Sequence, residues 1–202
     1  MNGGSAAGGT QPLGVSTVAS REDLRRALHA ISALLGPAAL ALPGSSGSYA
    51  LAGLVALALG LEIARHASPF VGRLVAAAGR TLFRPQEAHG VSGATSLAVG
   101  YFVAWLLFDH RLAAAAIVVA GLADPAAALV GRRLGRGSGK SVAGSTACAC
   151  TAAAALLASG FVPLTALLGG VAAATAERVR WRGADNVLVP LLVGGVLTLL
   201  HV

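Results

Sequence analysis

Long apolar segments alternate with short polar or charged ones along most of the chain. Their lengths predict α-helices rather than strands, and several are near the lower limit for crossing a bilayer, where about 20 residues are typical. We therefore expect an all-α, polytopic integral membrane protein with about seven transmembrane helices. The expected helices are 28–42, 48–63, 91–108, 112–130, 142–158, 161–176 and 187–202.

The polar stretches set the expected domain organisation. Residues 1–20 are rich in Gly, Ser, Ala and Thr and carry no charge, which is typical of a disordered N-terminal tail. The apolar segments leave no room for a separate soluble domain, so residues 21–202 are expected to form a single membrane-embedded domain. The mixed segment 66–89 is interpreted as a cytoplasmic loop that contains an interfacial helix.

Composition and charge support the membrane assignment. Of the 202 residues, 55% are hydrophobic and only 11% are charged, and the mean hydropathy is +0.75, so the chain lacks the polar surface of a soluble domain. With the N-terminus in the cytoplasm, all Lys and Arg residues except Arg111 fall at cytoplasmic helix ends, as the positive-inside rule requires. The net charge of +7 then needs no nucleic acid partner, and aromatic residues make up only 4% of the chain.

One carboxylate, Asp124, lies inside the predicted helix 112–130. A charge within a membrane segment is costly and is therefore a functional-site hypothesis by default. Together with Asp124, small residues recur at spacings of three or four on the same helical face, which lets another backbone or a ligand come close. These residues are Gly121, Ala128, Gly131 and Gly135.

A basic, glycine-rich loop follows this helix. Its backbone N–H groups and cations suit a polyphosphate, and hydroxyls at the start of the next helix lie where the helix dipole favours anions. The plainer interpretation is a positive-inside loop with glycines for flexibility. The candidate phosphate-binding residues are Arg132, Arg133, Gly135, Arg136, Lys140, Ser141, Gly144 and Ser145.

Further candidates lie at other predicted cytoplasmic helix ends. Asp185 and Asn186 open the last helix, where an Asp also commonly caps a helix. Glu62 is three residues from Arg65, a spacing that also favours a simple salt bridge. The remaining candidates are Arg25, His29, Arg84, Glu87 and Glu177.

The spacing of Asp124, Ala127, Gly131, Gly135, Lys140, Ser141, Gly144 and Ser145 resembles that of a known family. It is similar to the CTP-dependent membrane lipid kinases, namely dolichol kinase, phytol kinase and the CTP-type diacylglycerol kinase. The resemblance extends from Arg25 to Pro190 and includes the further candidates above. Two positions depart from the family pattern, with Ala123 in place of the usual Gly and Ala143 where many members carry Glu.

The resemblance implies transfer of the γ-phosphoryl group of CTP to the hydroxyl of a lipid alcohol, such as phytol, a polyprenol or dolichol, or diacylglycerol, at the cytoplasmic membrane face. Asp124 would hold Mg²⁺ or act as the base. Asp185, with Asn186, would take the other role or share the metal.

Two alternatives remain. One is a CTP:lipid transferase similar to phosphatidate cytidylyltransferase, although its long polar run near the C-terminus is not found here. The other is a non-enzymatic membrane transport or assembly protein, although the ionisable groups gather on one side rather than along a path across the membrane.

Overall fold

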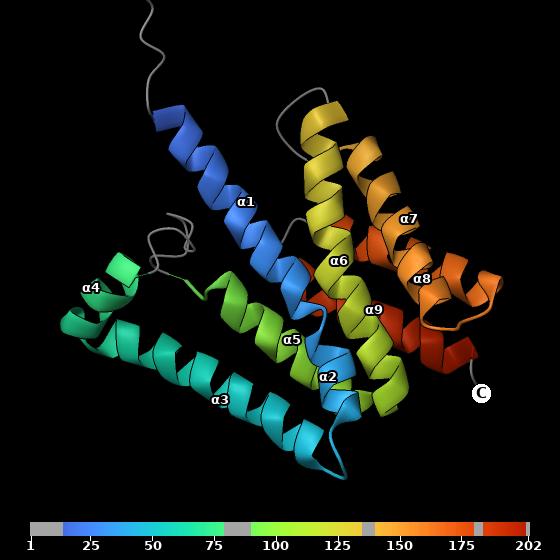
Figure 1. The fold of residues 1–202 in the computed structure, drawn as a ribbon, viewed down its shortest axis with the longest axis horizontal. Helices are drawn as coiled ribbons and strands as arrows, with labels where there is room; N and C mark the ends of the chain where they lie inside the picture. The colour runs from blue at the N-terminus through green and yellow to red at the C-terminus, as the bar shows by residue number, and fades with distance from the viewer. Residues whose placement is uncertain (1–13, 79–89, 135–139, 180–183, 201–202) are drawn as a thin grey trace, which may run out of the picture.

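The computed structural model describes residues 14–78, 90–134, 140–179 and 184–200 (Figure 1). Within these ranges all regular secondary structure is helical, which confirms the prediction of an all-α chain. The helices are α1 (Gly14–Ser32), α2 (Leu35–Ala41), α3 (Ser46–Ala67), α4 (Pro69–Ala78), α5 (Gly93–Leu107), α6 (His110–Leu134), α7 (Val142–Ala158), α8 (Pro163–Arg178) and α9 (Ala184–Leu200).

Most predicted boundaries lie close to the observed ones, and α7 has the predicted range. Two differences bear on the candidate site. Helix α6 continues four residues beyond the predicted end, so Arg132 and Arg133 occupy its last turn rather than a loop. Helix α1 begins at Gly14, so part of the segment predicted to be disordered is helical. The predicted interfacial helix corresponds to α4, while residues 79–89 lie outside the described part of the chain.

The expectation of one continuous helix over 28–42 is wrong, because the chain breaks between α1 and α2 at Ala33 and Leu34. Pro37 has no N–H group to donate to the carbonyl of Ala33, which removes the hydrogen bond that would join the two helices. The break turns α2 onto α6. At Gly36 an added Cβ atom would lie 2.6 Å from the carbonyl oxygen of Ala114, so only glycine permits this approach.

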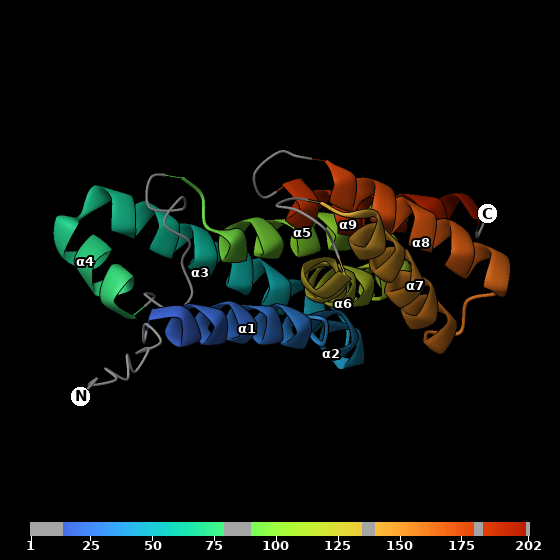
Figure 2. The same ribbon diagram turned by 90° about the horizontal axis from the view of Figure 1, so that it is seen from above.

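Helix α6 is the centre of the bundle and contacts α1, α2, α5, α7, α8 and α9. Figure 2 views α6 almost along its axis, with α1, α5, α7 and α9 around it. Its buried positions are mostly alanines, which let the neighbouring backbones come close. The buried residues of α6 are Ala113, Ala114, Ala115, Ala116, Ile117, Val119, Ala120, Gly121, Ala123 and Ala127.

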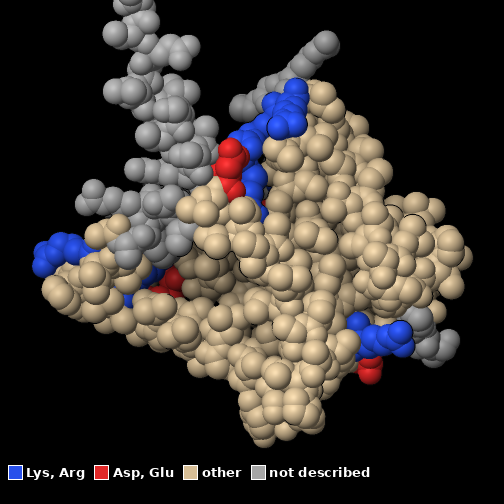
Figure 3. Space-filling model, viewed as in Figure 1, with Lys and Arg blue, Asp and Glu red and all other residues tan. Residues whose placement is uncertain are grey.

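Large apolar side chains lie mainly on the outside of the bundle. Alanine dominates the core, whereas many leucines, together with Ile31, Ile63 and Phe70, are exposed. Figure 3 shows the charged residues of this face in separate groups, with a broad surface of other residues between them. A small-residue core with an apolar exterior is typical of helices packed in lipid.

The lengths of the helices agree only in part with the expected membrane spans. In the described ranges, α3 and α6 are long and apolar enough to cross a bilayer, and α5, α7 and most of α9 form shorter apolar helices. These data give weak support to membrane association.

With the α1–α2 pair counted as one and the short α4 left aside, successive helices run in opposite directions (Figure 1). Side-chain contacts join the middle of α1 to the C-terminal end of α6, the C-terminal end of α3 and the N-terminal end of α9 to the start of α5, and the C-terminal end of α8 to the start of α7. We call these joined helix ends the site end, because most of the candidate residues that the structure describes lie there, while Asp124 and His29 lie further along α6 and α1. The contacts that define it are Asp23–Arg132, Glu62–Thr95, Ser145–Glu177 and Asn186–Gly93.

Candidate functional site

Asp124 of α6 faces His29 in the last turn of α1. The Nδ1 atom of His29 lies 3.8 Å from the Oδ2 atom of Asp124, too far for a hydrogen bond but close enough for an ionic contact when the imidazole is protonated. The Asp124 side chain is 35% exposed, so it is open to a ligand, whereas His29 is 17% exposed. The Nε2 atom of His29 is buried and has no hydrogen-bond partner among the described residues.

The contact between α1 and α6 fixes this pair. At Gly121 an added Cβ atom would lie 2.6 Å from the Cβ atom of Ala33, so the two helices touch closely one turn from Asp124. The hydroxyls of Ser32 and Tyr101 lie 2.9 Å apart and join α1 to α5 beside the pair.

Arg132 ties the end of α6 to α1. Its Nη2 atom donates to the Oδ1 atom of Asp23 at 3.1 Å, and Arg26 donates to the same oxygen at 3.0 Å. The hydrogen bond from Arg132 lowers the pKa of the exposed Asp23 carboxyl below its usual value. Arg25 and Arg26 both donate to Glu22, so acids of α1 already engage both of these arginines.

A second cluster joins the end of the basic loop to α8. The Nζ atom of Lys140 donates to the carbonyl oxygens of Glu177 and Val179, the latter at 3.0 Å, and lies 3.8 Å from the Glu177 carboxylate. Ser145 donates to that carboxylate at 3.1 Å and accepts from the Nε atom of Arg178 at 3.1 Å. Glu177 is buried, so these contacts compensate for the cost of removing its charge from water.

Ser141 begins α7 as its N-cap. Its Oγ atom accepts a hydrogen bond of 3.0 Å from the backbone N–H of Gly144, so this hydroxyl supports the helix start rather than pointing freely at a ligand. Gly144 also lets α7 approach α6, because an added Cβ atom would lie 3.0 Å from the carbonyl oxygen of Ala127 and 3.5 Å from the Cα atom of Gly131.

Helix α7 links the helices that carry the two clusters. Its Gly144 packs on Ala127 of α6, one turn from Asp124, and the next residue, Ser145, donates to Glu177 of α8. Sequence reasoning treated Glu177 and Asp124 as separate candidates, 53 positions apart.

Glu62 belongs to a third, structural cluster. As the i,i+3 spacing predicts, it pairs with Arg65, which also donates to the carbonyl of Gly90. Its Oε2 atom accepts from the backbone N–H of Ser92 at 3.3 Å and from the Thr95 hydroxyl at 3.0 Å. These contacts hold the end of α3 against the start of α5, and they account for this buried carboxylate without a ligand.

The start of α9 differs in part from the expectation. The helix begins at Ala184, so Asp185 lies within the first turn rather than before it. Asn186 donates to the carbonyl of Gly93 at 3.0 Å and so links α9 to α5. The side chain of Asp185 lies outside the described part of the structure. Four other candidates lie wholly outside it, namely Arg84, Glu87, Gly135 and Arg136.

The described donor set fits a metal that arrives with a ligand better than a closed protein cage. The described residues contain no group of three or more His, Cys, Asp or Glu side chains that would hold a metal ion. Mg²⁺ commonly takes only one or two protein carboxylates together with phosphate oxygens and water. The half-exposed Asp124 meets that requirement.

Some contacts were not foreseen. The Ser32–Tyr101 bridge and the bond from Arg178 to Ser145 join segments far apart in the chain, and no sequence pattern connects these residues. Comparisons with models of protein families, with curated proteins and with solved structures return no match for this chain.

Proposed function

We propose that this protein is a membrane-embedded kinase that transfers the γ-phosphoryl group of CTP to the hydroxyl of a lipid alcohol at the cytoplasmic face. The observation that carries the proposal is that Lys140 and Ser145 both meet the carboxylate of Glu177, at 3.8 Å and 3.1 Å. It joins the basic-loop lysine and the serine of the kinase-like pattern to the acid at the end of α8. The resemblance to the CTP-dependent lipid kinases supplies the donor and the class of acceptor.

The proposal includes seven membrane spans, with the N-terminus in the cytoplasm. The alternating helix directions, the alanine-rich core and the apolar exterior support this arrangement. In this orientation the site end faces the cytoplasm, where CTP is present. The exposed leucines of α3 and α8 would then face lipid.

In this mechanism the residues of the chain mainly position charges, which is the principal requirement of phosphoryl transfer. Asp124 would accept the proton of the lipid hydroxyl or hold Mg²⁺, and Asp185 would take the other role or share the metal with Asn186. Bound Mg²⁺ would neutralise charge on the phosphates. Arg132, Arg133, Arg136 and Lys140 would balance the remaining negative charge of the nucleotide.

The observed contacts add one requirement to this mechanism. Lys140 donates to two carbonyl oxygens at the end of α8. An ammonium group has three N–H donors, so binding of the nucleotide requires that a phosphate oxygen accepts from the donor that these carbonyls do not use or replaces one of them.

A labelling experiment tests the proposal against its enzymatic alternative. Membranes that contain the protein are incubated with Mg²⁺, a panel of lipid alcohols, phosphatidate and CTP labelled at either the α- or the γ-phosphate. A kinase places the γ-label in the lipid product. A cytidylyltransferase places the α-label in the lipid, with phosphatidate as its acceptor. Absence of both labels from every lipid, with protein present at matched levels, would reject both enzymes and favour a transport or assembly role.

A further inference from the structure

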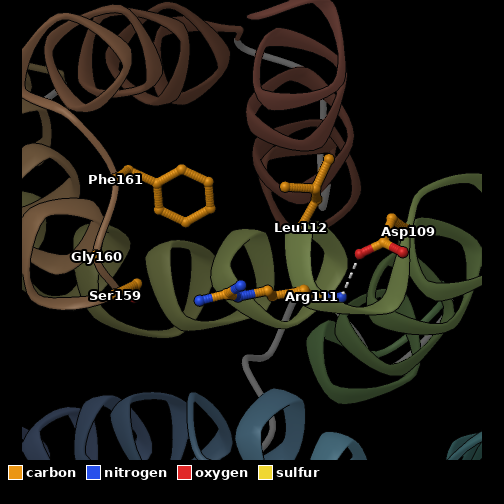
Figure 4. Close-up of a pocket in the computed structure, with 6 residues that line it drawn as sticks. All are labelled: Asp109, Arg111, Leu112, Ser159, Gly160 and Phe161. Atoms are coloured by element: carbon orange, nitrogen blue, oxygen red, sulfur yellow. Dashed lines mark hydrogen bonds between the residues drawn. The ribbon is translucent and has the colours of Figure 1, made fainter. Parts of the chain in front are cut away.

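A pocket at the opposite end of the bundle carries two opposite charges. It has a volume of about 370 Å³ and lies between the start of α6 and the turn that joins α7 to α8. For comparison, one molecule of liquid water occupies about 30 Å³, so the pocket can hold a polar lipid headgroup. Figure 4 shows its lining residues, which are Asp109, Arg111, Leu112, Ser159, Gly160 and Phe161.

Neither charge in the pocket is neutralised by a described residue. The exposed Arg111 side chain extends toward Ser159, and its guanidinium has no hydrogen bond or ion pair among the described residues (Figure 4). The Oδ1 atom of Asp109 accepts only the backbone N–H of Arg111, at 2.9 Å, and no ion pair joins the two side chains. The pocket therefore presents one cation and one anion at separate places.

The rest of the pocket lining is largely apolar. Leu112 and the ring of Phe161 line the pocket, and the exposed side chains of Val162 and Leu164 continue the apolar surface along the start of α8. A ligand that suits this site carries a positive group and a negative group close together and has an apolar part beside them. A free phosphate ion would leave Asp109 unpaired and the apolar walls uncovered.

We infer that this pocket binds a zwitterionic phospholipid whose headgroup bears an ammonium group, that is, a phosphoethanolamine headgroup. Arg111 donates to the phosphate and Asp109 accepts from the ammonium, while the acyl chains lie along Phe161 and Val162. The inference rests on the membrane placement in the proposed function but not on the kinase chemistry. It also gives a role to Arg111, the one basic residue that the sequence places away from the cytoplasmic side.

The two charges predict a defined order of lipid preference. A phosphoglycerol headgroup has the phosphate but no cation, so it leaves Asp109 unpaired and adds repulsion. A phosphocholine headgroup has the right charges, but its quaternary nitrogen has no N–H to donate to Asp109. Charge-assisted hydrogen bonds are the stronger ones, so ethanolamine is expected to be preferred over choline.

The inference can be tested by native mass spectrometry of the purified protein, after reconstitution in an equimolar mixture of phosphatidylethanolamine, phosphatidylcholine and phosphatidylglycerol of the same acyl chains. We expect the wild type to retain phosphatidylethanolamine about two- to fivefold more than either competitor, the range for an exposed charge pair. Asp109→Asn should abolish the preference over phosphatidylcholine and raise retention of phosphatidylglycerol. Arg111→Gln should reduce retention of all three lipids.

The two variants are expected to change the lipid profile in different ways, which general misfolding would not do. Arg73→Gln removes an exposed arginine from α4, far along the chain, and should leave the profile unchanged. Equal retention of the three lipids by the wild type, preference for phosphatidylglycerol, or an equal effect of Arg73→Gln would overturn the inference. Carbonate extraction of membranes tests the membrane placement separately, and no step depends on catalysis.

Discussion

The imidazole of His29 lies 3.8 Å from the carboxylate of Asp124, and the two residues are 95 positions apart in the sequence. Both were candidates from the sequence, yet their proximity depends on the close contact of Ala33 with Gly121. The pair thus links the catalytic hypothesis to the packing of α1 on α6. A change in that packing is expected to reach the site.

Asp124→Asn keeps the size of the side chain but removes the charge that binds a metal or accepts a proton. We expect lipid-alcohol phosphorylation to fall by at least about 100-fold, the lower range for loss of a general base, with normal membrane insertion. Activity is measured in membranes at matched protein levels. Thr175→Val is the control, because this exposed Thr175 hydroxyl donates only to its own helix, at Val171. Near-full activity of Asp124→Asn would leave Asp124 as a packing residue.

The membrane topology is tested with reporter fusions. Because all but one of the basic residues are assigned to one side, a reporter after Val202 should be external, and one at Arg136 should be cytoplasmic. If both reporters lie on the same side of the membrane, the proposed arrangement of seven spans is wrong. It would not by itself exclude an enzyme with a different number of spans.

The phosphoryl donor is expected to be CTP rather than ATP. The chain ends its basic loop with Gly139, Lys140 and Ser141, but Leu134 occupies the position of the first Walker A glycine, and the preceding element is a helix rather than a strand. Initial rates with the two nucleotides at equal concentration give the comparison. Efficient use of ATP, with no turnover of CTP, would contradict the resemblance to the CTP-dependent kinases.

Lys140 and Glu177 should behave as a coupled pair. Lys140→Met leaves the buried Glu177 carboxylate without its nearest cation, and Glu177→Gln removes the charge that Lys140 meets at 3.8 Å. The destabilisation of the double variant should be smaller than the sum of the two single effects by about 0.5–1 kcal/mol, as contacting residues usually show. Unfolding in detergent gives these values. As a control, Lys140→Met is combined with Thr198→Val, near the C-terminal end of α9, and the destabilisations of these two variants should simply add. Equal coupling in both pairs would count against a direct contact between Lys140 and Glu177.

Gly121 is expected to tolerate no larger side chain. Gly121→Ala would place a Cβ atom 2.6 Å from that of Ala33, and relief of such a clash typically costs about 1–3 kcal/mol. Gly53 of α3 is a matched control, because an added Cβ atom there meets nothing within 4 Å. In a helix interior Gly53→Ala should be neutral or stabilising. The melting temperatures of the two variants in detergent give the comparison, and equal values would contradict the close packing of α1 on α6.

The hydrophobic pattern was sufficient for the helices but not for their contacts. Apolar length located α5 to α9 because each is a continuous segment between polar loops. It failed at Ala33, where the break comes from the missing N–H of Pro37 and from packing on α6. The pair Gly36–Pro37 was the available signal, but hydropathy alone does not register it.

For the candidate site, the sequence pattern selected Asp124 and Lys140 by residue type and spacing. Their partners depend on tertiary structure. The contact between His29 and Asp124 requires the antiparallel packing of α1 and α6, and Lys140 meets Glu177 only because α8 returns beside α7. Neither relationship leaves a periodic signal in a single chain.

If the proposed seven spans cross a bilayer, the short helices have a consequence for the lipid around them. At about 1.5 Å per residue, the 15 residues of α5 and the 17 of α7 extend only about 22–26 Å, against a hydrocarbon thickness of about 30 Å. Lipid around such helices thins to match them, at a modest cost for each ångström of mismatch. The protein would therefore partition into the thinner membranes of a cell, and the local thinning would draw the hydroxyl of a membrane-bound alcohol toward the aqueous phase.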